Sequence, residues 1–65
     1  MLSLTINGES RTLPEPLTVA DLLRHLGHDP RKVAIEVNRV VVPARQHGEY
    51  CLTNDDTVEI VTLVG

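Results

Sequence analysis

The sequence predicts a small α+β domain in which one helix covers one face of a mixed sheet. Three observations indicate it: an alternating segment followed by a tight-turn dipeptide, a helical stripe of aliphatic residues, and several short strand-like segments after that stripe. The chain has 65 residues, which leaves room for one hydrophobic core. We therefore expect a single domain over residues 1–65.

The first two strands are predicted as a hairpin. Residues 2–6 alternate apolar and polar side chains, a period that gives a strand one buried and one exposed face. Asn7-Gly8 follows directly and suits the positive φ angles of a two-residue turn. A second strand should run back over residues 9–13. Pro14 and Pro16 end it, because each lacks a backbone donor and keeps the preceding residue extended.

A short helix is predicted over residues 19–26. Its apolar positions recur with helical spacing and form one stripe, at Val19, Leu22, Leu23 and Leu26. Thr18 is placed as the N-cap, and Asp21 three residues later completes a capping box. Gly27 supplies the left-handed residue that ends the helix. One face of this helix should pack on the sheet.

Strand patterns return after the helix. Residues 33–37 alternate, residues 40–42 form a short apolar run closed by Pro43, and a last strand runs from residue 57 to about residue 63, after a turn at 53–56. We expect the first and last strands to be parallel neighbours at the centre of the sheet, joined by a right-handed connection. This is the β-grasp, or ubiquitin-like, arrangement, with a mixed sheet of four to five strands.

The charge balance argues against nucleic acid as a partner. The formal net charge is −3 and Tyr50 is the only aromatic residue, whereas nucleic-acid binders cluster cations and stacking rings. An acidic small protein is better suited to a basic groove on another protein. No apolar run approaches the roughly 20 residues of a membrane span, and no secretory signal is present. With its single cysteine, the chain is expected in the cytoplasm, away from membranes.

The usual catalytic and metal-binding constellations are missing from the pattern. His25, His28 and His47 lack the spacing of a helical metal pair and are expected to be solvated. Cys51 is expected to be a small buried hydrophobe rather than a nucleophile. Asp55-Asp56 lies in a turn, where consecutive carboxylates point apart. We therefore expect no self-contained enzyme, and no cofactor or metal held by the chain itself.

The C-terminal strand differs from the others in having apolar residues on both faces. Val58 and Ile60 should point inward, while Val61 and Leu63 continue the side begun by Glu59. Either an overlapping edge or loop covers these two side chains, or they belong to a surface that a partner buries. The chain then ends in Gly65, which has no Cβ to obstruct close approach to a partner's active site.

Four runs stand out in the second half of the chain: Ala34-Ile35-Glu36-Val37-Asn38, Val41-Val42-Pro43 followed by Arg45, Asp55-Asp56-Thr57-Val58-Glu59-Ile60-Val61, and Val64-Gly65. In this order they resemble the ThiS family, the sulfur carriers of thiamine biosynthesis. Asn7-Gly8 and the leucine-rich helix fit the same pattern, so the resemblance covers nearly the whole chain. The family is similar to the small subunit of molybdopterin synthase and more remotely to ubiquitin, all with the β-grasp fold.

The resemblance implies chemistry at Gly65. The family's terminal carboxylate is adenylated with ATP and Mg²⁺ in an E1-like adenylyltransferase. A persulfide sulfur donor then converts it to a thiocarboxylate, which is delivered to thiazole synthase. On this interpretation the chain is a cosubstrate and not an enzyme. Val61, Thr62, Leu63 and Val64 are expected to contact these partners, within a flexible tail over residues 62–65, and the free chain is expected to be a monomer.

One departure from the family concerns the tail, which ends in Gly-Gly in the family and in Val64-Gly65 here. Gly65 either corresponds to the first glycine of that pair or closes a shortened tail. Because each residue adds roughly 3.3–3.6 Å of reach, we expect the 65-residue form to accept sulfur poorly and a second glycine to restore it. Two alternatives stay open: a molybdopterin-type sulfur carrier, which the lack of Phe and Trp disfavours, and a β-grasp interaction module that transfers nothing.

Overall fold

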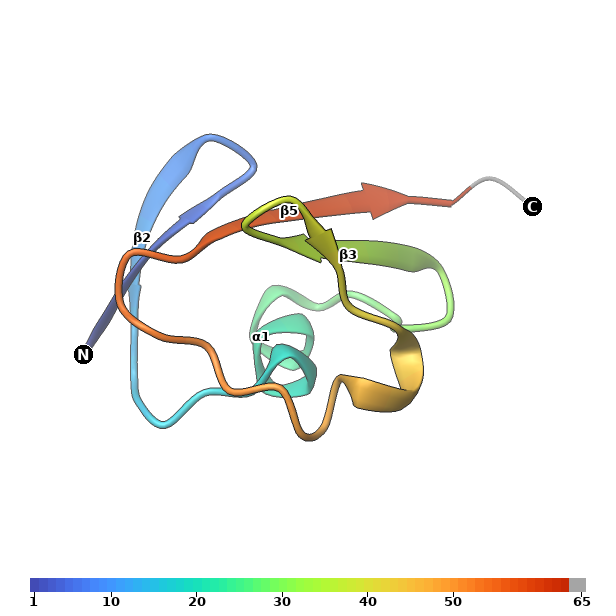
Figure 1. The fold of residues 1–65 in the computed structure, drawn as a ribbon, viewed down its shortest axis with the longest axis horizontal. Coiled ribbons are helices and arrows are strands. Elements are labelled where there is room, and N and C mark those ends of the chain that lie inside the picture. The colour runs from blue at the N-terminus through green and yellow to red at the C-terminus, as the bar shows by residue number, and fades with distance from the viewer. Residues whose placement is uncertain (64–65) are drawn as a thin grey trace.

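The computed structural model describes residues 1–63 of the chain. The elements follow in the order β1 (Leu2–Ile6), β2 (Glu9–Leu13), α1 (Val19–Leu26), β3 (Val33–Val37), β4 (Val40–Val41), the 3-10 helix η1 (Ala44–Gln46) and β5 (Thr57–Thr62). The strands form one five-stranded sheet in the order β2-β1-β5-β3-β4. Figure 1 shows α1 lying across one side of this sheet. The predicted β-grasp arrangement is confirmed, and β1 and β5 are parallel neighbours at its centre.

Both hairpins turn through two residues with positive φ. Asn7 (φ 49°) and Gly8 (φ 84°) join β1 to β2, as the sequence predicts. Asn38 (φ 52°) and Arg39 (φ 69°) join β3 to β4 in the same way. This second turn lacks the glycine that would have predicted it from the sequence. Left-handed backbone at both central positions matches the twist of the flanking strands, so each pair of strands stays in register.

The helix is capped at both ends by the predicted residues. The Thr18 side chain accepts a hydrogen bond from the Asp21 amide, and the Asp21 carboxylate accepts one from the Thr18 amide, each at 3.1 Å. Gly27 ends the helix with φ 75° and donates its N–H to the carbonyl of Arg24. The apolar stripe faces the sheet, and Val19, Leu22 and Leu23 are buried.

The core lies between α1 and the inner face of the sheet. Alternate side chains of the three central strands point into it, and Leu17, Val42 and Leu52 close it from the connecting segments. Its strand residues are Leu2, Leu4, Ile6, Val33, Ile35, Val37, Val58 and Ile60. Within residues 1–63, no helix is long and apolar enough to cross a membrane.

His47 corrects the expectation that all three histidines are solvated, since it is only 5% exposed. Its Nε2–H donates to the carbonyl oxygen of Val42 at 3.0 Å. Its own carbonyl accepts from the amide of Ala20 at 2.9 Å, which ties the end of η1 to the first turn of α1. His47 is therefore a packing residue of the loop that follows β4.

Cys51 corrects the expectation of a buried thiol, because its side chain is exposed. The residue forms an isolated antiparallel bridge with Thr18. Neighbouring residues in such an extended segment point to opposite sides, and here Leu52 takes the inward position. Leu52 therefore occupies the buried position in this segment, and the side chain of Cys51 faces solvent.

Candidate functional site

The C-terminal strand β5 is paired with β1 at its first two residues and with β3 from Val58 to Thr62. On the β1 side, Asn7 donates its backbone N–H to the carbonyl of Val58 at 2.9 Å. On the β3 side, pairing continues to the end of the strand, where Thr62 lies opposite Val33. The Leu63 amide still donates to the carbonyl of Lys32 at 2.8 Å. Hydrogen bonds to the sheet therefore fix the position of the chain up to Leu63, the last residue described.

Beyond the point where β1 and β5 separate, the side chain of Asn7 makes the hydrogen bonds to β5 that a neighbouring strand would otherwise make. Strand pairing on this side ends at Ile6 and Val58. Beyond it, the Oδ1 atom of Asn7 accepts from the Ile60 amide at 2.8 Å, and its Nδ2 donates to the Ile60 carbonyl at 3.2 Å. Sequence reasoning identified Asn7 only as a turn residue, since nothing local reveals a contact 53 positions away. The amide of Asn7 thus orients the strand that leads to the tail.

The other turn asparagine holds the start of β5. The Oδ1 atom of Asn38 accepts from the Thr57 amide at 3.0 Å, and its Nδ2 donates to the Asp56 carboxylate at 2.9 Å. Asp56 is buried and also accepts from the Thr53 amide, whereas Asp55 is exposed. The expectation that these consecutive carboxylates do not form a pair is confirmed, and Asp56 stabilises the turn.

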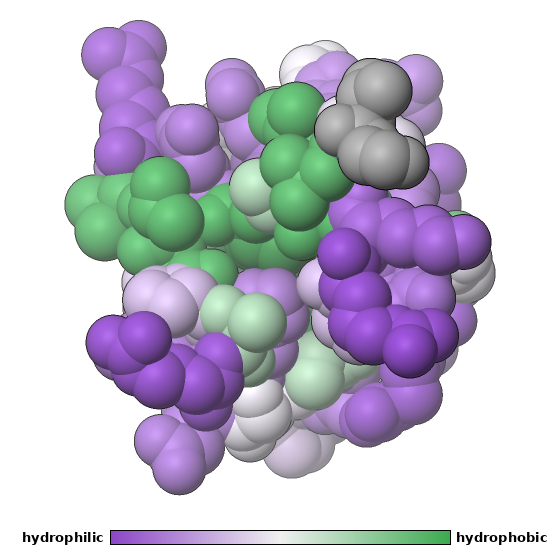
Figure 2. Space-filling model, turned by 90° about the vertical axis from the view of Figure 1, so that its right-hand side faces the viewer, coloured by the Kyte–Doolittle hydropathy of each residue, from purple (hydrophilic) through white to green (hydrophobic). Residues whose placement is uncertain are grey.

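The outward side of β5 exposes apolar side chains at its C-terminal end. Val61 is 51% exposed and Leu63 is 53% exposed, so neither a strand edge nor a loop within residues 1–63 covers them. Val40 and Val41 of β4 are exposed as well. We call Val40, Val41, Val61 and Leu63 the apolar patch. Figure 2 shows hydrophobic side chains gathered on the face at this end of the molecule.

The expected contact residues lie partly in this region. Val61, Thr62 and Leu63 are all exposed at the end of β5, and two of them belong to the apolar patch. The expected Val64 contact and the reacting Gly65 lie outside the described residues. The contribution of β4 was not expected, because the sequence indicates only a short apolar run over residues 40–42 and does not reveal that, of these three, Val42 alone is buried.

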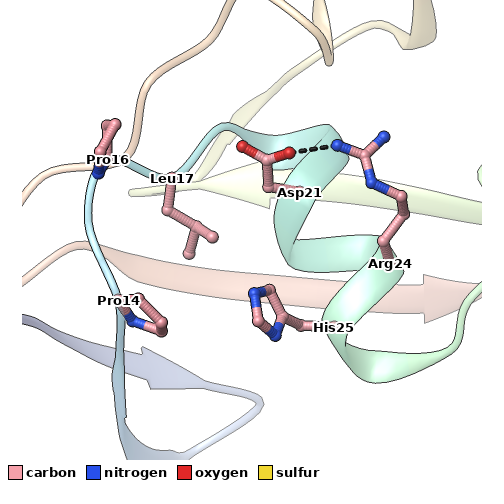
Figure 3. A pocket seen from close by; sticks show the side chains of 6 residues that line it. All are labelled: Pro14, Pro16, Leu17, Asp21, Arg24 and His25. Carbon is pink, nitrogen blue, oxygen red and sulfur yellow. Dashed lines mark hydrogen bonds and ion pairs between the residues drawn. The ribbon is translucent and has the colours of Figure 1, made fainter.

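A depression of about 350 Å³ lies away from the tail, between the start of α1 and the segment before it. Pro14, Pro16, Leu17, Asp21, Arg24 and His25 line it (Figure 3). Hydrogen bonds from Thr18, first from its backbone, together with the charge of Arg24, lower the pKa of Asp21 below its ordinary 3.8. Figure 3 shows Asp21 paired with Arg24, while the His25 ring lies apart. This carboxylate caps a helix and is not poised to exchange protons.

The other candidate ligands stay separate in the fold. Within residues 1–63, no group of three or more His, Cys, Asp or Glu side chains could hold a metal ion. His25 and His28 flank the end of α1, His47 is buried beside Val42, and Cys51 faces outward near Thr18. In the described part of the chain, the fold places the apolar patch beside the C-terminal end of β5, which hydrogen bonds to β3 hold in position.

Comparison with known proteins identifies the family. The family model of ThiS matches residues 4–65. A thiazole synthase of Paramagnetospirillum magneticum is 41% identical over 64 residues, which cover 98% of this chain and 20% of that protein. The uncharacterized protein ycf40 of Porphyra purpurea is 38% identical over 64 residues and is covered to 90%. The chain thus spans about one fifth of the thiazole synthases that it matches.

Solved structures agree with the sequence comparison. The crystal structure of the thiamine biosynthesis protein (ThiS) from Geobacter metallireducens superimposes with a TM-score of 0.87 at 28% identity, covering 98% of this chain and 97% of that one. The solution structure of a thiamine biosynthesis protein from the same organism gives 0.84 at 28% identity, with 98% and 86% covered. With the match to the family model and the β-grasp topology, this chain belongs to the ThiS family of small sulfur carrier proteins of thiamine biosynthesis.

Proposed function

We propose that Gly65 carries the sulfur, as a C-terminal thiocarboxylate that is delivered to thiazole synthase. The observation that carries this proposal is the family match, which extends through Gly65. The direction of β5 supports it, because the strand runs beside β3 to one end of the sheet (Figure 1). The sheet holds the chain up to Leu63, so the segment before the proposed reacting residue has a fixed position that a partner could recognise.

The proposed reaction begins with activation of a poor electrophile. The Gly65 carboxylate attacks the α-phosphate of ATP, pyrophosphate leaves, and an acyl-adenylate forms. The outer sulfur of a donor persulfide then attacks the acyl carbon and displaces AMP, so that an acyl disulfide links carrier and donor. A thiol cleaves the sulfur–sulfur bond by exchange, which leaves the thiocarboxylate on Gly65 and a disulfide on the donor side.

The catalytic groups in this scheme belong to the partners. An E1-like adenylyltransferase would bind ATP and Mg²⁺, a persulfide-bearing donor would supply sulfur, and thiazole synthase would use it. The carrier would bind no cofactor and would contribute only its terminus and its contact surface. Glycine suits the reacting position because a narrow channel in a partner leaves no room for a Cβ atom.

The contact surface is proposed to be Val61, Thr62, Leu63 and Val64, with the remainder of the apolar patch beside them. Exposed apolar groups of this kind mark protein interfaces. Thiazole synthase is the partner best supported by the comparisons, because proteins of that name contain a segment matching this chain within one polypeptide. The free chain is proposed to be a monomer that exchanges between partners.

Intact-mass spectrometry tests the proposal. The chain is incubated with the adenylyltransferase of its own genome, ATP, Mg²⁺ and a persulfide donor, and the mass change of an oxygen-to-sulfur exchange is recorded. Gly65→Ala should slow this exchange by about tenfold or more, because a Cβ is added at the reacting residue. Gly48→Ala is the matched control, since Gly48 has open space around its Cβ position.

The outcomes separate the three interpretations. Exchange that needs ATP and depends on Gly65 supports the carrier mechanism, and sulfur transfer to thiazole synthase then assigns it to thiamine rather than to a molybdopterin-type pathway. Equal exchange in both alanine variants would contradict the role of Gly65. Poor exchange in the unmodified chain that a second glycine added after Gly65 restores supports the expected effect of tail length. Absence of any exchange in both forms would leave the interaction module, which binds partners and transfers nothing.

A further inference from the structure

Two carboxylates face each other on the outer side of the sheet. Glu36 in β3 lies directly opposite Glu59 in β5. Their strand neighbours Ile35, Val37, Val58 and Ile60 are buried, so both glutamates belong to the face turned away from α1. Asn38 donates its N–H to Thr57, two residues along each strand. Glu36 and Glu59 therefore occupy the same kind of hydrogen-bonded site, with Cα atoms about 5.5 Å apart.

Apolar residues neighbour this acidic pair toward β4 and toward the end of β5, whereas the next pair in the other direction, Asn38 and Thr57, is polar. Val41 lies opposite Glu36 on the other neighbouring strand, and Ala34 opposite Val61 forms the next pair along. The two glutamates thus interrupt the apolar patch. Within residues 1–63, the ion pairs are Met1–Glu15, Asp21–Arg24 and Asp29–Arg31, and none of them involves Glu36 or Glu59.

This arrangement is unfavourable in the isolated chain. Like charges directly opposite each other on neighbouring strands destabilise a sheet. A partner that covers the apolar patch would also remove water from both carboxylates, which costs more unless a cation replaces that water. A guanidinium group meets the requirement, because its planar fork of N–H donors can serve two carboxylates at once.

We propose that the outer sheet face docks on thiazole synthase by taking one arginine side chain of that enzyme between Glu36 and Glu59. Val41, Val61 and Leu63 of the apolar patch lie on this outer face and pack beside the ion pair, where they reduce its contact with water. Val40 is opposite the buried Val37 and lies on the other face. This inference rests on the proposed function, which supplies the partner. The net charge of −3 has the sign that steers this face toward a basic surface.

Binding measurements with conservative variants test the ion pair. The labelled 65-residue chain is titrated with the thiazole synthase of its own genome, and Glu36→Gln and Glu59→Gln are compared with it. Each variant should bind about tenfold or more weakly, and the double variant should lose less than the two losses combined, because one arginine serves both carboxylates. Glu49→Gln, an exposed glutamate after η1, removes the same charge elsewhere and should bind within about twofold of the unchanged chain.

A second measurement uses the free chain, where the same substitutions should stabilise the fold although they weaken binding. Relieving the repulsion should raise the melting temperature of Glu36→Gln or Glu59→Gln by about 2–4 °C, with Glu49→Gln unchanged. Tighter folding with weaker binding supports the proposal. Unchanged binding of both face variants would overturn it, and so would an unchanged or lower melting temperature. If the unmodified chain fails to bind, this inference falls, and the mass assay on Gly65 decides separately whether the carrier function stands.

Discussion

Replacing Asn7 by glycine tests how firmly the sheet holds β5 ahead of the tail. The side chain of Asn7 makes two hydrogen bonds to the backbone of Ile60, at 2.8 Å and 3.2 Å. Its φ of 49° lies in the left-handed region, which glycine adopts without a steric penalty. Asn7→Gly therefore removes both bonds and leaves the turn geometry in place.

The expected loss follows from those two bonds. Each contributes about 1 kcal/mol net, so the free energy of unfolding should fall by about 2 kcal/mol. A chain of 65 residues has a total stability of about 3–10 kcal/mol, and the melting temperature should fall by about 8–16 °C. The Ile60 amide should also exchange its hydrogen about 30-fold faster, because its acceptor is gone.

Arg39→Gly is the matched control. Arg39 has a φ of 69° at the tip of the other two-residue turn and is exposed. Glycine there adds the same backbone freedom to the unfolded chain, and it relieves the cost that a left-handed conformation imposes on arginine. We expect a change in stability within about 1 kcal/mol of zero for this variant.

Urea unfolding followed by circular dichroism gives the stabilities, and amide exchange by NMR gives the local effect at Ile60. If Asn7→Gly and Arg39→Gly differ by less than about 0.5 kcal/mol, the side chain of Asn7 contributes nothing as a strand substitute. Exchange at Ile60 that follows only the global stability would show that the bonds do not act locally.

Two further predictions concern the helix. The hydrogen bonds from Thr18 hold the pKa of Asp21 below 3.8, so the stabilisation by this carboxylate is present above pH 3.8 and lost as the pH falls through the lowered value. Asp21→Asn should therefore lower the melting temperature at neutral pH, and the difference from the unchanged chain should shrink as the pH falls below 3.8. A difference that stays constant in acid would contradict this. Leu22→Ala should lower the free energy of unfolding in urea by about 2–5 kcal/mol, because Leu22 is fully buried. Leu63→Ala should lower it by less than about 1 kcal/mol, because Leu63 is half exposed. Similar losses in the two variants would refute the assignment of the core.

The local elements could be predicted because their signals are local. The capping box of Thr18 and Asp21 and the left-handed Gly27 lie within one or two turns of the helix, and the structure confirms each of them. The burial of His47 could not be predicted, because it depends on a bond to Val42 and on packing beside α1. Cys51 was wrongly expected inside for a similar reason, since the bridge to Thr18 decides which side the residue faces.

The candidate site was predictable in part for the same physical reason. Alternation along β5 placed Val61 and Leu63 outward, and the structure confirms that both are exposed. The contribution of Val40 and Val41 was missed, because a run of valines does not reveal that only the next residue reaches the core. The pairing of Glu36 with Glu59 appears only when the register of β3 and β5 is known.

The apolar patch shows how stability and exchange are balanced in so small a domain. Val40 is 65% exposed and Val41 is 62% exposed, in a chain that has few apolar groups to spare for a core. Burying one such side chain fully is worth about 1.5–3 kcal/mol, and these residues, already part buried, would gain less than that on docking. Association itself costs at least about 4 kcal/mol, so the net affinity depends on the polar contacts that accompany the patch. A carrier must leave one partner to serve the next. In the proposed docking, Glu36 and Glu59 need a cation from the partner, so tight binding is limited to a partner that provides one.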